Sequence, residues 1–366
     1  MRKINPKSLY IHIPFCESIC DYCDFAKLQY FHSFAKQYLI ALEKELLETV
    51  DNKELDTIYI GGGTPTSLDD EQFESLLKMV IPYSKTVKEY TIEANPESLS
   101  LSKIKLMKEY GVNRVSIGVE STDDKILKSI NRKHTFSDVK KAVELLRENG
   151  IDNINLDLII GLPNVSEKML LKDIKNILSL NPMHISCYSL TVHEHTVFHI
   201  NGIEEPVEEY AFECYKLIDE FLQKEGYVHY EVSNWSRLGY MSQHNLTYWR
   251  NQRYYGIGLA ASGYIDNIRY KNTTNFNEYI NFVNKKETEI VSNIDEKEYE
   301  IMLRLRTIEG LNLDDFHTKF GIDLLKEKEQ EIKQYISQGY LTLDNGVIRP
   351  TFSGMMILDK IVIDLY

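Results

Sequence analysis

Three cysteines are the residues of this 366-residue chain whose type and spacing most clearly indicate chemistry. Cys16, Cys20 and Cys23 have a C-x3-C-x2-C spacing and follow directly after a predicted strand. Thiolates bind iron–sulfur clusters and zinc alike. A structural zinc ion needs four ligands, and no fourth cysteine is near in the sequence. On a loop, three thiolates can bind three irons of a cubane and leave one iron open, so we predict a 4Fe-4S cluster here.

The other two cysteines do not suggest a disulfide framework. The chain has five cysteines, an odd number, and Cys187 and Cys214 are isolated in the sequence. Cys214 falls in an apolar helical pattern with Phe212 and Tyr215, so we expect it in the core. Clustering of the remaining three favours a metal site in a reducing compartment.

Further polar and glycine residues recur near the ends of predicted strands. The sequence GGGTP at 61–65 follows the second strand, where missing side chains let the backbone approach an amino-acid-like ligand closely. Glu93 ends the third strand, Glu120 follows the fourth, and Asp157 lies in the fifth. Each carboxylate alone fits a solvated or capping role equally well. Their recurrence at one end of the strands predicts a site there.

The elements that must position these residues are repeated strand and helix units. Helical patterns such as 34–50 and 136–149 separate the predicted strands, which favours a parallel sheet with right-handed crossovers. We therefore predict an α/β fold, a partial (β/α)6 TIM-like barrel. A Rossmann-type sheet is the alternative, but no G-x-G-x-x-G follows the first strand. The predicted strands are Ser8–Ile13, Thr57–Ile60, Tyr90–Ile92, Arg114–Gly118, Ile154–Ile160 and His184–Tyr188.

The carboxyl-terminal part of the chain differs in amino-acid composition. Aromatic, asparagine and glycine residues become frequent after Tyr230, and the polar stretch 284–296 is predicted to be a linker. We place one domain at 1–291, including an aromatic-rich extension from about residue 230, and a second at 292–366. Helical patterns and a short hairpin around residues 344–346 predict a small winged-helix-like module in the second domain.

Composition narrows the classes of partner. Asp and Glu outnumber Lys and Arg by 55 to 42, and the net charge of -13 argues against nucleic-acid binding. The first eight residues are polar, and no apolar run is long enough to span a bilayer. We expect a globular, cytoplasmic protein.

The order of these motifs resembles a known family. The chain reads YIHIPFC at 10–16, GGGTP at 61–65, EANP at 93–96, RVSIG at 114–118, Asn131-Arg132, and DLIIGLP at 157–163. This series is similar over nearly the whole chain to the radical S-adenosylmethionine (SAM) family that contains oxygen-independent coproporphyrinogen III dehydrogenases and HemW-type haem chaperones.

The resemblance implies a cofactor set and its residues. The three cysteines would bind the 4Fe-4S cluster, SAM would chelate the open iron, and a low-potential electron donor would reduce the cluster. Glu120 stands where the family commonly has Gln. The residues implied to surround SAM are Tyr10, Tyr22, Gly62, Gly63, Thr64, Glu93, Glu120, Arg132 and Asp157.

Two features distinguish the branches of the family. Coproporphyrinogen dehydrogenases carry an additional cysteine two residues after the third, where this chain has Phe25, and a longer amino-terminal segment. The sequence HNLTYW at 244–249 matches the H-N-x-x-Y-W motif of HemW-type chaperones. We predict that His244 binds haem iron, beside the flat faces of Tyr248 and Trp249. The alternative is a packing histidine, with the iron ligand drawn from His12, His184, His229 and Cys187.

Two other segments were considered as possible binding sites. The stretch YYGIGLAASGY at 254–264 lacks a proline and a histidine that relatives usually show, so no role carries over for that histidine. His193, His195 and His199 lie close in sequence, but their spacing fits no simple helical pair of metal ligands. We do not expect a metal site there.

The function that the resemblance implies is that of a haem chaperone, a carrier more than an enzyme. It would bind haem and a SAM-ligated cluster and pass haem to apoproteins of respiration, with transient docking to membrane proteins. The alternative is oxidative decarboxylation of coproporphyrinogen III to protoporphyrinogen IX. A radical SAM enzyme with an unrelated substrate is a third reading, because one fold supports many reactions.

Overall fold

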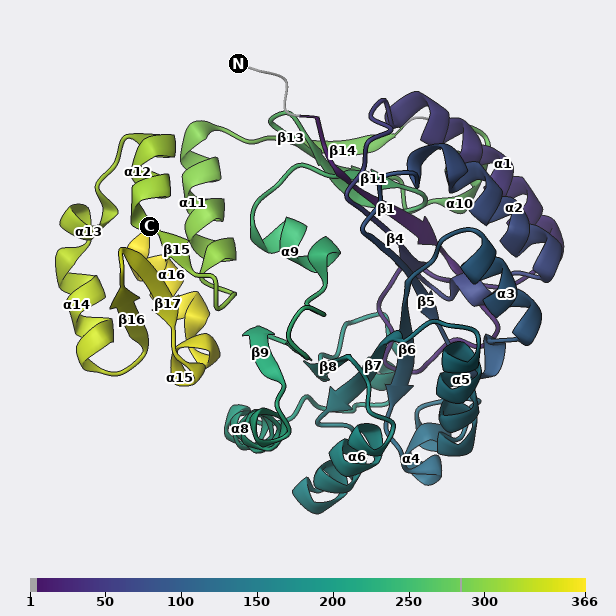
Figure 1. The fold of residues 1–366 in the computed structure, drawn as a ribbon, viewed down its shortest axis with the longest axis horizontal. Coiled ribbons are helices and arrows are strands. Elements are labelled where there is room, and N and C mark those ends of the chain that lie inside the picture. The colour runs from purple at the N-terminus through teal and green to yellow at the C-terminus, as the bar shows by residue number, and fades with distance from the viewer. Residues whose placement is uncertain (1–4, 284) are drawn as a thin grey trace.

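The protein, seen here as a computed structural model, is described over residues 5–283 and 285–366. Six parallel strands form its centre and pair in chain order, with α-helices packed along the sheet (Figure 1). The predicted α/β fold and its six strands are confirmed. These strands are β1 (Ser8–Ile13), β4 (Thr57–Gly62), β5 (Glu89–Ala94), β6 (Arg114–Glu120), β7 (Asn153–Ile160) and β8 (His184–Ser189).

The helices between the strands follow the apolar periodicity of the sequence. In one of them Val139, Val143 and Leu146 are buried, and Thr135 closes a capping box with Asp138 at its first turn. The helices of this layer are α1 (His32–Thr49), α2 (Asp70–Val80), α3 (Leu101–Glu109), α4 (Asp124–Ser129), α5 (Phe136–Glu148) and α6 (Glu167–Ser179), with single 3₁₀ turns at Pro65–Ser67, Ile81–Tyr83 and Pro96–Ser98.

The first strand shows how the sheet separates a packing face from a face that holds polar groups. Leu9, Ile11 and Ile13 are fully buried in the main apolar core, as alternation along a strand requires. Tyr10 and His12 point to the opposite face, where the hydroxyl of Tyr10 lies 2.9 Å from Nδ1 of His12. The interior of the partial barrel is therefore lined in part by polar side chains.

The aromatic-rich extension completes both edges of the sheet. The full order is β11-β1-β4-β5-β6-β7-β8-β10-β9, with β11 parallel to β1, and β10 antiparallel to both β8 and β9. The elements at these edges and in the extension are β9 (Val228–Glu231), β10 (Asn234–Ser236), α9 (Gln243–Trp249), β11 (Tyr255–Ile257), β12 (Ser262–Ile265), β13 (Ile268–Asn272), α10 (Phe276–Ile280) and β14 (Lys286–Ile290). The short strands β2 (Phe15–Cys16) and β3 (Leu28–Gln29) flank the cysteine loop, and α7 (Val197–Ile200) and α8 (Glu208–Lys224) follow β8.

The predicted linker at 284–296 is wrong over most of its length. β14 pairs antiparallel with β13 over five residues, and the next helix begins at Asn293. Backbone pairing with β13 keeps these polar residues in a strand although their exposed side chains carry no apolar pattern. Residue 284 and the first four residues, part of the predicted polar amino terminus, lie outside the described residues.

The carboxyl-terminal module has its own apolar core. Ile301, Phe316, Ile332, Ile348 and Ile361 are among its buried members. The predicted helical module is confirmed and also contains a three-stranded antiparallel sheet. Its elements are α11 (Asn293–Arg304), β15 (Leu311–Asn312), α12 (Leu313–Phe320), α13 (Leu324–Glu327), α14 (Glu329–Ser337), β16 (Leu341–Asp344), β17 (Val347–Pro350), α15 (Phe352–Met356) and α16 (Leu358–Leu365).

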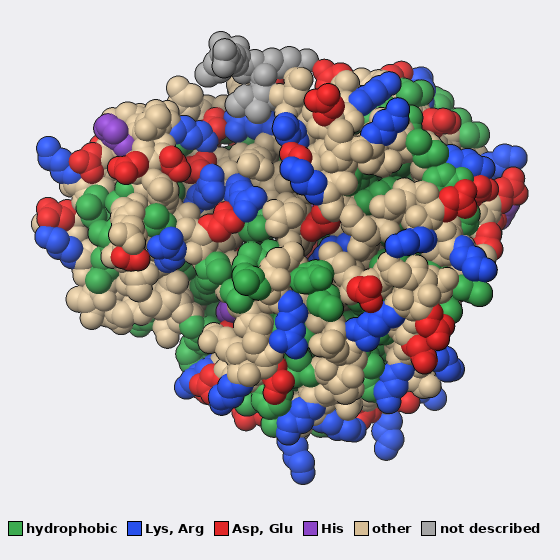
Figure 2. Space-filling view, viewed as in Figure 1, with side chains coloured by type: hydrophobic (Ala, Val, Ile, Leu, Met, Phe, Trp, Pro, Cys, Tyr) green, Lys and Arg blue, Asp and Glu red, His purple; other side chains and the backbone are tan. Residues whose placement is uncertain are grey.

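The surface carries charges of both signs. On the face shown in Figure 2, Lys and Arg side chains lie interspersed with Asp and Glu. Among the described residues, no helix has the length and apolar character needed to cross a bilayer.

A buried carboxylate at the start of β5 fixes the position of α9. The oxygens of Glu89 accept hydrogen bonds from the hydroxyl of Ser242 at 3.2 Å and from the backbone N–H groups of Gln243 at 2.8 Å and His244 at 2.9 Å. The first turn of a helix leaves such N–H groups without intrahelical partners. Glu89 therefore joins the sheet to the helix that carries the HNLTYW motif.

Replacing Glu89 with Ala should lower the free energy of unfolding by about 2 kcal/mol, because three donors lose their acceptor. Urea denaturation of the iron-free protein measures the difference. Glu71→Ala removes an exposed carboxylate from the first turn of α2 and should change stability by less than about 0.5 kcal/mol. Equal denaturation midpoints for the two variants would contradict this account.

Candidate functional site

The cysteine loop begins after the carboxyl end of β1, and its three cysteines line one cavity. Cys16 is buried, whereas Cys20 and Cys23 are partly exposed. Burial raises the pKa of the Cys16 thiol to about 11, and the neighbouring Cys23 and Cys20 add to that rise. The same burial raises the pKa of Cys23. Thiols ligate metals as thiolates, so binding of iron would release protons from this loop.

A segment after α4 holds the cysteine loop in place. Nδ2 of Asn131 donates to the carbonyl oxygen of Ile19 at 2.8 Å, and the N–H of Asp21 donates to the carbonyl oxygen of Ile130 at 3.3 Å. Nη1 of Arg132 lies 3.6 Å from Sγ of Cys20. Residues more than a hundred positions apart in the sequence thus fix the backbone of the loop.

The GGGTP motif closes on the same loop from β4. The N–H of Gly63 donates to the carbonyl oxygen of Ile13 at 2.8 Å, and the N–H of Thr64 donates to that of Phe15 at 2.7 Å. The hydroxyl of Thr64 is 3.6 Å from Sγ of Cys16. A Cβ on Gly63 would lie 2.8 Å from these two carbonyl oxygens. The glycine is required here by the close approach of backbone to backbone.

Gly62 is constrained in two further ways. Its φ is +108°, and a Cβ there would lie 2.3 Å from the ring of His12. The structure therefore gives a reason for glycine at this position that does not involve a ligand. A bulky residue at Gly62 would disturb the backbone and His12 before it reached the cavity.

Most of the predicted cofactor residues line one cavity of about 370 Å³ beside the thiols. This volume lies within the usual range for small-molecule sites. The cavity receives side chains from the carboxyl ends of β4 to β8, where sites of parallel barrels are built. The predicted residues that line it are Cys16, Cys20, Tyr22, Cys23, Gly62, Gly63, Thr64, Glu93, Glu120, Arg132 and Asp157.

Two half-buried carboxylates form one wall of this cavity. Glu93 accepts hydrogen bonds from the hydroxyl of Tyr59 at 2.7 Å and the N–H of Gly62 at 2.8 Å, and burial raises its pKa. Asp157 accepts from Nδ2 of Asn155 at 2.6 Å and from the hydroxyl of Ser116 at 3.2 Å. Burial raises the pKa of Asp157 to about 7. Both carboxylates are held rigidly and can accept hydrogen bonds from a polar ligand.

The opposite wall is built around a buried arginine. Nη2 of Arg132 lies 3.7 Å from Oε1 of Glu120 and donates to the carbonyl oxygen of Gly118. Although burial opposes its charge, the neighbouring Tyr22 and Glu120 raise the pKa of Arg132. The register of β6 with β7 shifts between Gly118 and Glu120, and Glu120 adopts a φ of +65°. This irregularity lets the end of β6 turn its carboxylate toward the arginine.

Two predicted ligand-binding residues lie elsewhere. Tyr10 does not line the cavity of the thiols; its hydroxyl contacts Nδ1 of His12 in a neighbouring groove. His244 is buried at the other end of the sheet, with Nδ1 2.8 Å from the hydroxyl of Thr57 and Nε2 2.7 Å from that of Tyr248. Burial lowers the pKa of His244 to about 3. With both nitrogens engaged, this geometry favours the packing alternative over an iron ligand.

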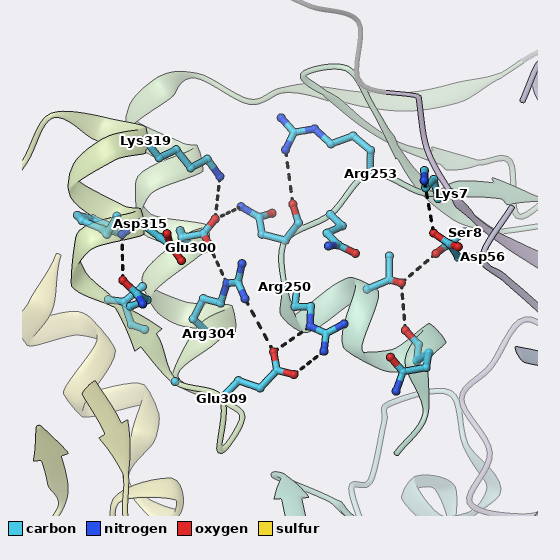
Figure 3. A pocket seen from close by; sticks show the side chains of 18 of the residues that line it. Lys7, Ser8, Asp56, Arg250, Arg253, Glu300, Arg304, Glu309, Asp315 and Lys319 are labelled. Carbon is cyan, nitrogen blue, oxygen red and sulfur yellow. Dashed lines mark hydrogen bonds and ion pairs between the residues drawn. The ribbon is translucent and has the colours of Figure 1, made fainter. Parts of the chain in front are cut away.

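A cavity of about 770 Å³ separates the amino-terminal ends of β1 and β4 from the carboxyl-terminal module (Figure 3). Arg250 and Glu309 are paired across the junction, with Nε of Arg250 2.8 Å from the carboxylate. Within the carboxyl-terminal module, Glu300 lies 2.8 Å from both Arg304 and Lys319. No cysteine lines it. Its described side chains therefore connect two parts of the fold, and we do not assign it to the chemistry of the thiols.

Three other histidines named in the sequence analysis have polar side-chain partners. Nε2 of His193 lies 3.1 Å from Asp24, Nδ1 of His229 lies 3.2 Å from Asp219, and His184 contacts Asn155. In the part of the chain that the structure describes, no three His, Cys, Asp or Glu side chains are close enough to share one metal ion.

Sequence reasoning missed several residues that shape the site. Ser116 and Asn155 orient Asp157, Tyr59 orients Glu93, and Asn95 donates through Nδ2 to the hydroxyl of Thr64 at 3.2 Å. Polar residues at alternate positions of otherwise apolar strands are the signal that could have identified them, because alternate residues share the inner face.

Two family models match separate parts of the chain. Residues 10–177 match the model of the Radical SAM superfamily. Residues 291–357 match the model of the HemN C-terminal domain.

Individual relatives are similar over almost their whole length. The chain is 38% identical to the haem chaperone HemW of Bacillus subtilis, covering 97% of this chain and 98% of that protein. It is 32% identical to HemW of Escherichia coli, covering 99% and 98%. Among solved structures, the coproporphyrinogen III oxidase HemN of Escherichia coli, a radical SAM enzyme, superposes with a TM-score of 0.84 at 21% identity, covering 99% and 90%. That structural likeness shows the fold.

Asp157→Asn should increase stability more at high pH than at low pH. The folded wild type keeps the Asp157 proton up to a pKa of about 7, while the unfolded chain releases it near the ordinary value of 3.8. Wild-type stability is therefore lost as pH rises between these values, and the amide carries no such penalty. Between pH 4 and pH 8 the difference in unfolding free energy should grow by up to about 4 kcal/mol in the iron-free protein.

Thermal unfolding of both proteins across this pH range measures the effect. The matched control is Asp152→Asn, which changes an exposed carboxylate directly before β7 and should leave the pH profile unchanged. A stability difference for Asp157→Asn that does not vary with pH would show that folding does not raise the pKa of this carboxyl.

Proposed function

This chain belongs to the HemW haem chaperone family within the radical SAM superfamily, and on that premise we propose that it binds haem and a SAM-ligated 4Fe-4S cluster and delivers haem to apoproteins of respiration. The observation that carries the proposal is the meeting of Cys16, Cys20 and Cys23 at one edge of the cavity that holds Glu93, Arg132 and Asp157. Thiols supply iron ligands, and the cavity supplies partners for a charged, amino-acid-containing cofactor.

The residues present fit the cluster and SAM on chemical grounds. The hydroxyl of Thr64 and the guanidinium of Arg132 each lie 3.6 Å from a cysteine sulfur, where hydrogen bonds tune a cluster. The buried Nε of Arg132 has no hydrogen-bond partner within the described residues. Buried donors are rarely left unpaired in native proteins, so a bound ligand is a reasonable partner for it.

The protein's own contribution is to hold and shield the cofactors. When bound, a SAM-ligated cluster supplies one-electron chemistry. Glu93 and Asp157 offer fixed acceptors for hydroxyl or ammonium groups of SAM, and Gly63 and Thr64 fix the loop that carries Cys16. A low-potential electron donor and transient docking to membrane-associated acceptors in the cytoplasm complete the proposal. Both rest on the family resemblance.

Anaerobic assays of haem binding and of coproporphyrinogen III turnover test the proposed function. The reconstituted protein should bind haem at about one equivalent, with a Soret band that saturates. With coproporphyrinogen III, SAM and dithionite it should form no protoporphyrinogen IX. Absence of haem binding would overturn the carrier proposal, and turnover of coproporphyrinogen III would replace it with the dehydrogenase.

Single substitutions of the three loop cysteines should abolish the cluster. Cys16→Ala, Cys20→Ala and Cys23→Ala each leave two thiolates, too few to anchor three irons. After anaerobic reconstitution, the iron content and the broad absorbance of the iron–sulfur chromophore should be lost. Cys214→Ala, which changes a buried cysteine on α8, should retain both. An intact chromophore in any loop variant would disprove the ligand assignment.

A further inference from the structure

A second groove lies directly beside the cluster cavity. It has a volume of about 770 Å³, and its walls come from β1, the cysteine loop, α9 and the turn before β12. Aromatic rings line it: Tyr10, Tyr248 and Tyr254, of which the last two have ring centres 4.6 Å apart. The hydroxyls of Tyr10 and Tyr248 are engaged by His12 and His244. The groove therefore offers a large, partly aromatic surface.

The groove and the cluster cavity share one wall. Ile19, Asp24, Phe25 and Lys27 line both. Phe25 is 64% exposed, so its ring lies uncovered at the boundary. A molecule in the groove would thus be separated from the thiols only by the cysteine loop itself.

One imidazole in the groove stands free. His12 also lines it, but its Nε2 lies 2.8 Å from the carbonyl oxygen of Ala26 and its Nδ1 is engaged by Tyr10. His195 is exposed at the groove and has no hydrogen bond or ion pair among the described residues. Its neighbour His193 is held by Asp24. An unengaged imidazole can bind haem iron through nitrogen.

The charges of the groove suit a ligand with carboxylates. Lys27 and the exposed Lys271 bring ammonium groups to it. Lys27 donates to the carbonyl oxygen of Cys23, which uses part of its hydrogen-bonding capacity. The carboxylate of Asp24 is paired with His193 at 3.1 Å. The groove therefore retains lysine donors for anionic substituents of a flat ligand.

We infer that this groove is the haem site of the protein, with His195 as the axial ligand of the iron and Lys271 as a partner of a propionate. This inference rests on the proposed function and specifies where haem binds. His244 contributes only indirectly, because its Nε2 holds the hydroxyl of Tyr248 in the groove wall at 2.7 Å. Haem in this position would lie next to the cysteine loop.

Anaerobic titration with haemin, followed by the Soret band, tests the site in the reconstituted protein. His195→Ala should weaken binding by about tenfold or more and shift the Soret band, because an iron–nitrogen bond is lost. Added imidazole should restore the wild-type spectrum. His199→Ala is the matched control, because it removes an exposed imidazole of α7 that does not line the groove, and it should bind haemin as the wild type does.

The possible results distinguish an error in the location of the haem site from an error in the proposed carrier function. If the wild type binds haemin and His195→Ala has the same affinity and spectrum, the site is wrong and the carrier proposal stands. Equal losses in His199→Ala and His195→Ala would also overturn the assignment of His195 as axial ligand. If the wild type binds no haemin, both proposals fail. Retention of the iron–sulfur absorbance in each variant shows that the fold is intact.

A second comparison tests the propionate contact. Lys271→Gln should weaken haemin binding by about two- to fivefold, as expected for a partly exposed ion pair. With haemin dimethyl ester, which lacks the carboxylates, wild type and Lys271→Gln should bind equally. An equal loss for haemin and its ester would contradict the assignment of Lys271.

Discussion

The parallel alignment of β1 and β4 to β8 is the constraint on which the rest of the structure depends. Because the six strands run in one direction and pair in chain order, their carboxyl ends lie along one edge of the sheet. Cys16 follows β1, Gly63 follows β4, and Asp157 lies in β7. Residues that are far apart in sequence therefore lie at the same edge of the sheet.

Long-range backbone contacts then fix the loop that begins at this edge. Thr64 from the β4 side and Asn131 from the far side both bond to the segment around the cysteines. The loop is thereby held at its start and near Ile19, while Cys20 and Cys23 remain partly exposed. The same loop separates the cluster cavity from the aromatic groove, so the two proposed ligands would lie on either side of one short segment.

Much of the fold could be predicted from sequence, because its signals are local. Strand β1 agrees with the prediction at both ends, since Ser8–Ile13 alternates between a packed and an inward face. The predicted linker was wrong because β14 is held by pairing with β13, an interaction that its own polar residues do not reveal. Part of the candidate site could also be predicted from sequence, because Glu93 and Asp157 lie on strands that the apolar pattern of the sequence indicated. Tyr10 and His244 lie outside the cavity of the thiols, and family motifs alone do not show which face or which end of the sheet a side chain occupies.

The central claim is that the cysteine loop holds a cluster whose open iron faces the cavity of Glu93, Arg132 and Asp157. Electron paramagnetic resonance of the dithionite-reduced, reconstituted protein, recorded with and without SAM, tests it most directly. The account predicts a signal of a reduced 4Fe-4S cluster whose g values change when SAM is added, because SAM would coordinate the open iron. A cluster signal that stays the same at saturating SAM would contradict the account.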